Sequence, residues 1–329
     1  MTGRIKTVKY VFIINPKAGP KNSEETIKKE AARAASVSQK RTGITYEYEF
    51  YTTKTALDAT EFVRRYLDEH SEEVCFVACG GDGTLFEVTQ AVMGHDNAYL
   101  TVYPCGSGND YVKYYGGKNH FLDLTGIFEG SVRDVDVMRF EDHYSINILN
   151  FGFDTAVVET MQKVRRTPVI GGSNSYYTGI ATALMKAMKN RCKVYADGEL
   201  LNPDGMLLLC TLGNGAYVGG SFNCSPKSDN DDGLMEVCLV KPINIFRFLK
   251  LLPHYQNGTH LDCPHFKDIM VYRRAKSVKI EAYDGFNLCF DGELINAREA
   301  TVENLERALH FIVPRDSMVT PAKMPALVK

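Results

Sequence analysis

Short apolar runs alternate with amphipathic segments over the first 110 residues of the chain. Four runs have the length and composition of strands, and the segments between them place apolar residues at helical spacing. The strands are expected at Val8–Ile14, 46–50, Val74–Cys79 and Ala98–Tyr103, and the helices at Ser23–Val37, at 59–67 and from residue 84 on. This alternation predicts a doubly wound, mostly parallel sheet, in which ligands bind beyond the carboxyl ends of the strands.

Strand patterns dominate from Asp134 on. They cover Val135–Phe140, Tyr144–Asn150, Lys193–Ala196, Met206–Leu212, Leu234–Val240, Ile269–Tyr272, Ser277–Ala282 and Asn287–Phe290. Helical patterns interrupt them at Ser175–Met188 and Ile243–Leu252. We therefore predict an α/β domain over residues 1–134 and a β-rich, sandwich-like domain over residues 135–310.

Composition narrows the classes of function. A net charge of −2 gives no reason to expect nucleic acid as a partner. The nine cysteines form no C-x-x-C pair and no close Cys/His cluster, which disfavours a zinc site and favours reduced thiols in the cytoplasm. We expect no signal peptide, and no apolar run approaches the roughly 18 residues of a membrane span.

The most informative stretch is Gly80-Gly81-Asp82-Gly83-Thr84, directly after an apolar strand. Its glycines permit close approach of a ligand, and Thr84 with Glu87 has the form of a capping box, which predicts a helix start at Thr84. The free amides and the dipole of such a helix favour phosphate. The carboxylate of Asp82 suits this loop if a divalent cation lies beside the phosphate or if a proton must be taken. A plain glycine turn with an N-capping acid fits the stretch equally well.

Two further loops follow strand ends. Asn15-Pro16-Lys17-Ala18-Gly19 comes after the first strand, where the Asn15 amide can bond a phosphate or ribose and Gly19 lets backbone amides turn inward. Thr53, after the second strand, is a candidate helix N-cap.

The loop Gly106-Ser107-Gly108-Asn109-Asp110 follows the fourth strand. Ser107 and Asn109 offer hydrogen bonds to a nucleotide, and Asp110 can cap the next helix. That helix carries tyrosines at positions 111, 114 and 115, which favours packing over stacking on a base.

Acidic residues mark the second half of the chain. The run Asp229-Asn230-Asp231-Asp232-Gly233-Leu234 is typical of a solvated turn before a strand. Asp291-Gly292-Glu293 follows the last alternating strand, where Asp-Gly is foremost a hairpin turn. Because Asp197-Gly198-Glu199 repeats the tripeptide, it cannot indicate catalysis by itself.

The stretch Ile243–Leu252 is apolar on most sides, with Arg247 and Lys250 interleaved. Buried core is the favoured interpretation. The alternative is a patch that docks on a membrane, with its basic residues toward anionic headgroups.

In their order along the chain, these loops resemble those of the diacylglycerol kinase catalytic-domain family of lipid kinases, whose nucleotide loop reads Gly-Gly-Asp-Gly-Thr. NAD kinases and phosphofructokinases share that loop. The resemblance implies ATP as cofactor, bound by Asn15, Pro16, Lys17, Gly19, Thr53, Gly80, Gly81, Asp82, Gly83, Thr84, Ser107 and Asn109. It also implies a magnesium ion held by the Asp232 carboxylate and the carbonyls of Asp229 and Leu234.

The resemblance further selects Glu293 as the base that activates the acceptor across an interdomain cleft, with Asp291 in support. It assigns Asp82 to the magnesium and phosphate network, makes Asn214 a candidate for placing the acceptor, and implies that a tail from about residue 311 to 329 returns to the first domain. Phe86 stands where the family usually has Asn.

We therefore predict an ATP- and magnesium-dependent kinase that phosphorylates a hydroxyl of diacylglycerol or a similar lipid. It would be cytoplasmic and peripherally associated with the membrane. The alternatives are a kinase of a soluble substrate, such as an NAD kinase, and a nucleotide-binding module without turnover. Exposed sheet edges leave a homodimer open.

Overall fold

The computed structural model describes residues 7–20, 23–166 and 185–317, which form two compact units. One unit holds the described residues up to Val137 and from Glu306 on, and the other spans Met138–Leu305. Residues 175–184 of the helix expected at Ser175–Met188, and residues 318–329 of the expected tail, lie outside the described part of the chain.

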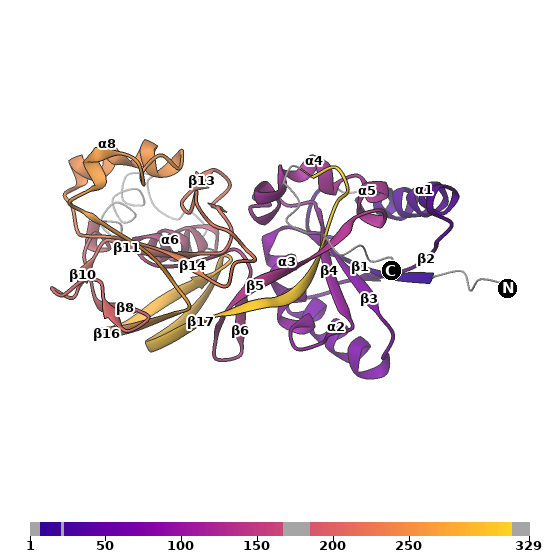
Figure 1. Ribbon diagram of the computed structural model, residues 1–329, viewed down its shortest axis with the longest axis horizontal. Helices are drawn as coiled ribbons and strands as arrows, with labels where there is room; N and C mark the ends of the chain where they lie inside the picture. Colours follow the sequence, from indigo (N-terminus) through magenta and orange to yellow (C-terminus); the bar gives the residue numbers. More distant parts are fainter. Residues whose placement is uncertain (1–6, 21–22, 167–184, 318–329) are drawn as a thin grey trace. The chain divides into compact units, whose positions relative to one another are not determined.

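The first unit is built on a parallel sheet with the strand order β2-β1-β3-β4 (Figure 1). Its strands are β1 (Thr7–Ile14), β2 (Thr45–Thr52), β3 (Val74–Gly80) and β4 (Ala98–Pro104). The end of β17 (Glu293–Val313) pairs in parallel with β4 through His310 and Phe311. All seven residues of β3 are buried, as expected for a central strand covered on both faces.

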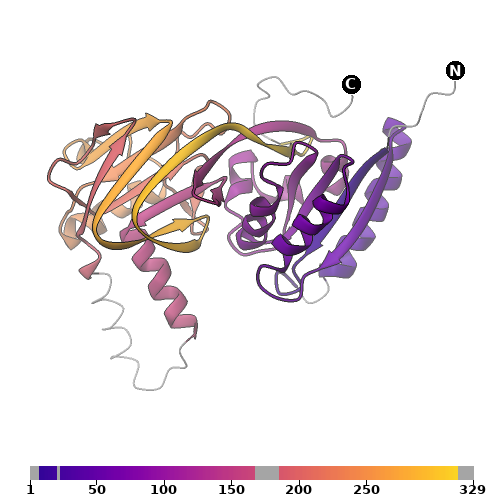
Figure 2. The same cartoon turned by 90° about the horizontal axis from the view of Figure 1, so that it is seen from below.

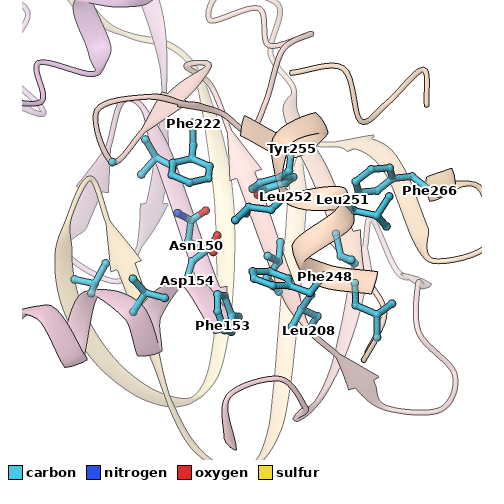
Figure 3. A pocket seen from close by; sticks show the side chains of 17 residues that line it. Asn150, Phe153, Asp154, Leu208, Phe222, Phe248, Leu251, Leu252, Tyr255 and Phe266 are labelled. Atoms are coloured by element: carbon cyan, nitrogen blue, oxygen red, sulfur yellow. The ribbon is translucent and has the colours of Figure 1, made fainter. Parts of the chain in front are cut away.

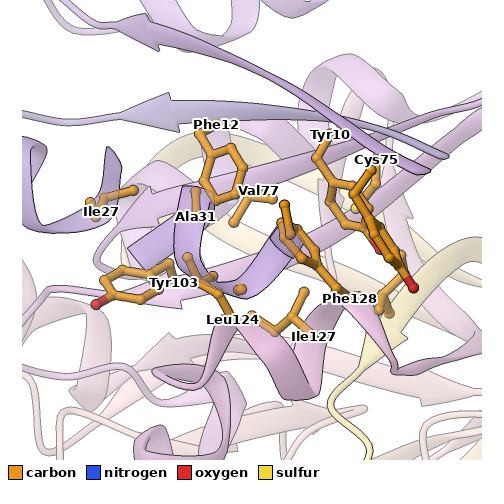
Figure 4. Packing of buried hydrophobic residues seen from close by; sticks show 14 of the residues in the cluster. Tyr10, Phe12, Ile27, Ala31, Cys75, Val77, Tyr103, Leu124, Ile127 and Phe128 are labelled. Atoms are coloured by element: carbon orange, nitrogen blue, oxygen red, sulfur yellow. The ribbon is translucent and has the colours of Figure 1, made fainter. Parts of the chain in front are cut away.

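Helices cover both faces of this sheet. They are α1 (Ser23–Thr42), α2 (Asp58–Glu69), α3 (Asp82–Val92), α4 (Lys118–Phe121) and α5 (Leu124–Phe128), with the 3₁₀ turn η1 at Tyr111–Tyr115. On one face, alternate residues of the strands pack against α1 and α5 (Figure 4). There Phe128 stacks on Tyr46, with ring centroids 5.0 Å apart. On the other face, Phe76 packs edge-on against Tyr66 of α2. The period-two pattern of the strands therefore supplies two apolar surfaces.

The second unit is mostly antiparallel and contains the path β15-β14-β11-β7-β16. Its larger strands are β7 (Ile148–Gly152), β8 (Asn190–Ala196), β11 (Leu209–Gly213), β14 (Met235–Val240), β15 (Met270–Ala275) and β16 (Ser277–Phe290). Shorter strands are β6 (His143–Ser145), β9 (Glu199–Leu200), β10 (Met206–Leu207), β12 (Tyr217–Val218) and β13 (Phe222–Asn223). The strand β5 (Ser131–Phe140) enters this unit at its end and pairs with β6.

Several expected strands are divided or joined. The strands β16 and β17 run side by side as a long ribbon (Figure 2), and a register shift between Glu281 and Phe286 lies where two separate strands were expected. Two helices accompany the sheet, α6 (Phe153–Arg166) and α8 (Ile245–Gln256), and a 3₁₀ turn, η2, spans Pro264–Phe266. The pattern did not predict α6, whose first half contains the β-branched residues Thr155, Val157 and Val158. All nine cysteines are free thiols.

Candidate functional site

Two glycine loops lie against each other at the carboxyl end of the parallel sheet. The carbonyl of Gly80 accepts hydrogen bonds from the amides of Cys105 at 2.7 Å and Gly106 at 3.2 Å. A Cβ atom on Gly106 would lie 2.5 Å from the Cα atom of Gly81, which is closer than real side chains approach. Only glycine fits this contact, so the loops after β3 and β4 form one continuous surface.

Asp82 joins the same two loops through its side chain. Its Oδ1 atom accepts a hydrogen bond from the amide of Asp110 at 2.7 Å, and a Cβ atom on Gly108 would lie 2.6 Å from its Oδ2 atom. Burial, reinforced by the neighbouring Asp110 carboxylate, raises the pKa of Asp82. Asp110 itself forms an ion pair with Lys113. Asp82 is thus held where a cation or a donor facing the loop would stabilise its charge.

The helix α3 begins at Asp82, with Gly81 as its N-cap and no side-chain cap, so the capping box predicted at Thr84 is wrong. The amide of Thr84 donates to the carbonyl of Gly81 at 3.0 Å, and its hydroxyl accepts a hydrogen bond from the Asn15 side chain at 3.1 Å. Among the described residues, the amides of Asp82 and Gly83 donate no hydrogen bond. They are the free donors that a helix N-terminus offers to phosphate.

A polar cavity of about 180 Å³ lies beside these loops. It is lined by Asn15, Pro16, Lys17, Thr53, Lys54, Thr55, Ala56, Ala59, Thr84 and Glu87. The amide and hydroxyl of Thr53 both donate to the carbonyl of Ile14, at 2.8 and 3.3 Å. Because the N-cap of α2 is Leu57, the alternative role of Thr53 as a helix cap is wrong.

Three other predicted nucleotide contacts lie in the same loops. Gly19 has a φ of +81°, and a Cβ atom there would meet that of Cys105 at 3.2 Å. The buried Asn109 side chain bonds its own loop, donating to the carbonyl of Gly106 at 2.6 Å and accepting from its amide at 3.1 Å. Ser107 is exposed. Asn109 therefore shapes the loop, while the hydroxyl of Ser107 faces solvent.

The residues after this loop serve packing. The side chain of Asp110 does not cap η1, which corrects the sequence prediction. Tyr111 and Tyr115 are buried against Phe311, with ring centroids 5.1 and 5.6 Å apart, so their predicted packing role is confirmed. Phe86 is buried in α3, where it adds apolar contact in place of a polar side chain.

Asp291 in the second unit organises a turn. Its Oδ1 atom accepts hydrogen bonds from the hydroxyl of Ser145 at 2.8 Å and the amides of Asn147 at 3.2 Å and Ile148 at 2.9 Å. Its Oδ2 atom accepts from the amide of Ile146 at 3.0 Å. Burial outweighs these bonds and raises the pKa of Asp291 to about 6. The geometry fits a residue that supports its neighbours.

Glu293 differs from its counterpart in the repeated tripeptide. It is exposed, and its carboxylate has no hydrogen-bond or ion-pair partner among the described residues. In the other copy, Asp197 likewise accepts a backbone hydrogen bond, from Ser277 at 2.9 Å, but Glu199 is paired with Arg273 at 2.9 Å. Of the two glutamates, Glu293 is therefore the one whose carboxylate is available to a ligand.

The predicted magnesium ligands do not form a complete set. The Asp232 carboxylate accepts a hydrogen bond from the amide of Leu234 at 3.0 Å and forms an ion pair with Arg274. No group of three or more His, Cys, Asp or Glu side chains suited to a metal occurs among the described residues. With Arg274 on the one carboxylate of the set, the magnesium site at Asp229, Asp232 and Leu234 is not supported by these donors, and no step below uses it.

Asn214 follows β11 and is fully buried. Its amide donates to the carbonyl of Asn147 at 2.9 Å, and its side chain donates to that of Asn304 at 3.0 Å. These bonds hold neighbouring strands together, and a role in placing the acceptor stays a prediction.

An apolar cavity of about 420 Å³ lies inside the second unit (Figure 3). Its lining includes Phe153, Val157, Val158, Leu208, Leu209, Val218, Phe222, Val240, Phe248, Leu251, Leu252, Tyr255 and Phe266. Asn150 and Asp154 are polar members of this lining. The sequence did not lead us to either residue, although Asn150 interrupts the apolar run that ends at Phe153 and Asp154 follows that run directly, which was the available signal.

The helix α8 has two apolar faces. Phe248, Leu251 and Leu252 line the cavity, whereas Phe246 and Leu249 are 81% and 59% exposed. The interpretation of the stretch Ile243–Leu252 as buried core therefore holds for one face only, where Leu251 is buried. No helix among the described residues is long and apolar enough to cross a membrane.

Together these features define a class: an α/β unit with two glycine loops in contact at the start of a helix, followed along the chain by a β-sandwich-like unit. Residues 9–140 match the diacylglycerol kinase catalytic domain, and residues 147–313 match the YegS C-terminal NAD kinase beta sandwich-like domain. The chain belongs to the diacylglycerol kinase catalytic-domain family, and both the resemblance and the predicted fold class are confirmed.

Relatives extend over nearly the whole chain. A diacylglycerol kinase of Bacillus subtilis (strain 168) is 28% identical over 308 residues, which cover 93% of this chain and 96% of the relative. A protein of Alcanivorax borkumensis named "Probable lipid kinase YegS-like" is 27% identical over 78% of this chain and 84% of its own. The fold is similar to that of a diacylglycerol kinase from Bacillus anthracis, with a TM-score of 0.67 and 20% identity over 95% of this chain and 98% of that chain.

Proposed function

We propose that this protein transfers the γ-phosphoryl group of ATP to a hydroxyl of diacylglycerol or a similar lipid. The observation that carries the proposal is an apolar cavity of about 420 Å³ in a chain whose other unit has a glycine loop with free amides at a helix N-terminus. A soluble, highly polar acceptor such as NAD would gain little from that lining. The names of the relatives agree with a lipid acceptor.

The donor nucleotide would bind at the glycine loops of the first unit. The free amides of Asp82 and Gly83 would meet phosphate oxygens at the start of α3. Asn15 and Lys17 line the adjacent polar cavity, where an amide and an ammonium group can bond phosphate or ribose. Magnesium, when bound with ATP, would neutralise phosphate charge, and its protein ligands stay a prediction.

Glu293 would accept the proton of the lipid hydroxyl. Its carboxylate is exposed and without a partner among the described residues, while Asp291 fixes the turn that carries it. General-base catalysis contributes about 10²–10⁴ in rate, and positioning and charge neutralisation supply most of the rest. Asp291 is thus proposed as a positioning residue, because its own carboxylate is occupied by backbone amides.

The protein would bind its lipid acceptor at the membrane surface. The exposed Phe246 and Leu249 belong to the same helix whose inner residues line the apolar cavity. A helix with this arrangement can lie in the headgroup region while its inner face stays part of the acceptor site.

Transfer of labelled phosphate from γ-labelled ATP tests the proposal. The purified protein is supplied with magnesium and, in parallel, with diacylglycerol in mixed micelles, with NAD and with glycerol. We expect label in the lipid fraction only. Label in NAD would show that the protein is a kinase of a soluble substrate instead. Thermal stabilisation by ATP without transfer to any acceptor would show that it is a nucleotide-binding module.

A further inference from the structure

The apolar cavity of the second unit contains two polar side chains whose surroundings do not satisfy them. Asn150 extends from β7 and Asp154 from the first turn of α6, and both line the cavity among aromatic and aliphatic side chains (Figure 3). Tyr255, the other large polar residue of the lining, shares a hydrogen bond with the hydroxyl of Thr211 at 2.8 Å. The polar character that remains for a ligand is therefore that of Asn150 and Asp154.

The Oδ1 atom of Asn150 and the Oδ2 atom of Asp154 are buried and have no hydrogen-bond partner among the described residues. Buried polar atoms are nearly always paired, so two orphaned atoms in one cavity call for a ligand. An amide oxygen and a carboxylate oxygen accept hydrogen bonds, so a ligand group that pairs with either of them must be a donor. A hydroxyl, which has one hydrogen to donate, meets this requirement at one of the two oxygens at a time, whereas an ester or a hydrocarbon donates to neither.

The pairing of β7 with β16 shows how far Asn150 lies along the sheet from the turn that carries Glu293. Asn150 pairs with Cys289 across β7 and β16, and Leu149 pairs with Phe290. The next residue back along β7, Ile148, donates its amide to the Asp291 carboxylate. Two residues of strand span about 7 Å, so Asn150 and the Asp291 turn are separated by roughly the size of a small headgroup.

We propose that this cavity binds the aliphatic chain of the acceptor lipid and that Asn150 and Asp154 hold its free hydroxyl. The inference rests on the proposed function for the identity of the acceptor and deepens it, because it assigns the residues that recognise the hydroxyl. A lipid whose hydroxyl is esterified keeps the chain and loses the donor, so it leaves both oxygens unpaired. The cavity would therefore select for a free hydroxyl before any phosphate is transferred.

Direct binding measures this selectivity without the kinase reaction. The probes are dioctanoylglycerol and its acetylated derivative, which differ only in the free hydroxyl, titrated into the full-length protein by calorimetry without ATP. We expect the free alcohol to bind about ten- to a hundredfold more tightly, the range for a hydrogen bond to a charged or buried group. In Asp154→Asn and Asn150→Ala, this preference falls toward one while affinity for the acetylated lipid changes little. Equal binding of the two lipids by the wild type would overturn the proposal.

A second pair of variants tests the location of the chain. Val158→Trp fills the cavity from α6, and Ala156→Trp places the same ring on a part of that helix that lines a different surface hollow. Val158→Trp should abolish binding of both lipids, and Ala156→Trp should preserve it, with melting temperatures recorded for each. Unchanged binding in a folded Val158→Trp protein would refute the cavity as the chain site.

The outcomes separate this inference from the proposed function. Hydroxyl-selective binding without phosphate transfer would refute the proposed kinase function and support the lipid site in the cavity. If the wild type phosphorylates diacylglycerol and Asp154→Asn and Val158→Trp do so at the same rate, the kinase function is supported and the lipid site in the cavity is refuted.

Discussion

The Asp291→Ala variant tests whether the carboxylate of the last Asp-Gly-Glu tripeptide supports the fold. In the native protein it accepts hydrogen bonds from the amides of Ile146, Asn147 and Ile148 and from the hydroxyl of Ser145. Alanine removes every acceptor at once. Because residues 146–148 are buried, water cannot readily replace the carboxylate at their amides.

The expected cost follows from two opposing terms. Each buried amide left without an acceptor costs about 1–3 kcal/mol, so three cost about 3–9 kcal/mol. Burial has raised the pKa of Asp291 from 3.8 to about 6, so the ionised carboxylate is held at neutral pH at a cost of about 3 kcal/mol, which the substitution relieves. The net loss in the free energy of unfolding is about 3 kcal/mol, or a fall in melting temperature of about 6–12 °C for a unit of this size.

Thermal and urea unfolding of purified variants measure this loss. The matched control is Asp197→Ala, because Asp197 has the same left-handed backbone, with φ of 46° against 47°, and also accepts backbone amides. Asp197 is exposed, so solvent can replace it and the expected loss is under about 1 kcal/mol. If Asp291→Ala unfolds within 1 kcal/mol of wild type, or no less stably than the control, the supporting role assigned to Asp291 is refuted.

Four further predictions concern the proposed base Glu293, the glycine loops of the first unit, the buried carboxyl of Asp154 and the docking of α8 on a membrane. Glu293→Gln should lower the rate of phosphate transfer by a factor of about 10²–10⁴ with an unchanged melting temperature. A variant as active as the wild type would refute the role of Glu293 as the base. Gly106→Ala should abolish thermal stabilisation by ATP, since its Cβ atom would lie 2.5 Å from Gly81, whereas Gly285→Ala, whose nearest neighbour would be an Asn296 side-chain atom at 3.8 Å, should keep it. Burial raises the pKa of Asp154 to about 7, so the folded state binds a proton that the unfolded state has released above 3.8. The free energy of unfolding of the wild type should therefore fall relative to Asp154→Asn as pH rises from about 4 to 7, by at most about 4 kcal/mol, and a flat difference in urea unfolding would contradict it. The thiols of Cys210 and Cys238 and the hydroxyl of Tyr255 feel the charge of Asp154, but burial raises the pKa of each and they stay neutral over this range. Phe246→Ser with Leu249→Ser should weaken liposome binding in flotation assays without unfolding the protein, and unchanged flotation would argue against docking by α8.

The apolar periodicity predicted the strands of the first unit closely, because β1, β3 and β4 are short buried runs ended by a glycine or proline loop, and the half-exposed β2 alternates apolar and polar residues. The start of α3 was wrong for a specific reason. Thr84 and Glu87 have the spacing of a capping box, but the glycines before them let the helix begin two residues earlier, which frees the Thr84 hydroxyl for Asn15. Sequence patterns give the residue types suited to a cap and do not decide between two hydrogen-bond partners for one hydroxyl.

The candidate site was predictable in its loops and not in its contacts. The positions of Asp82 and Asn109 follow from the order of strands, yet nothing local in the sequence indicates that Asp82 bonds the amide of a residue 28 positions away. The polar pair Asn150 and Asp154 was missed because its meaning depends on an apolar cavity assembled from α6, α8 and several strands. Such a cavity is a product of tertiary packing, which periodicity does not encode.

The repeated Asp-Gly-Glu tripeptide shows how chemistry is separated from structure in this chain. Both aspartates adopt a left-handed backbone and accept amides, so the Asp-Gly part serves a turn in each copy. The glutamates differ in their surroundings. Arg273 bonds Glu199 and lowers the pKa of its carboxyl, which makes it a weaker base and occupies its oxygens. Glu293 has no such partner among the described residues. A carboxylate can take a proton from a substrate only if no cation already holds it, so the local charge environment, and not the motif, selects Glu293 as the candidate base.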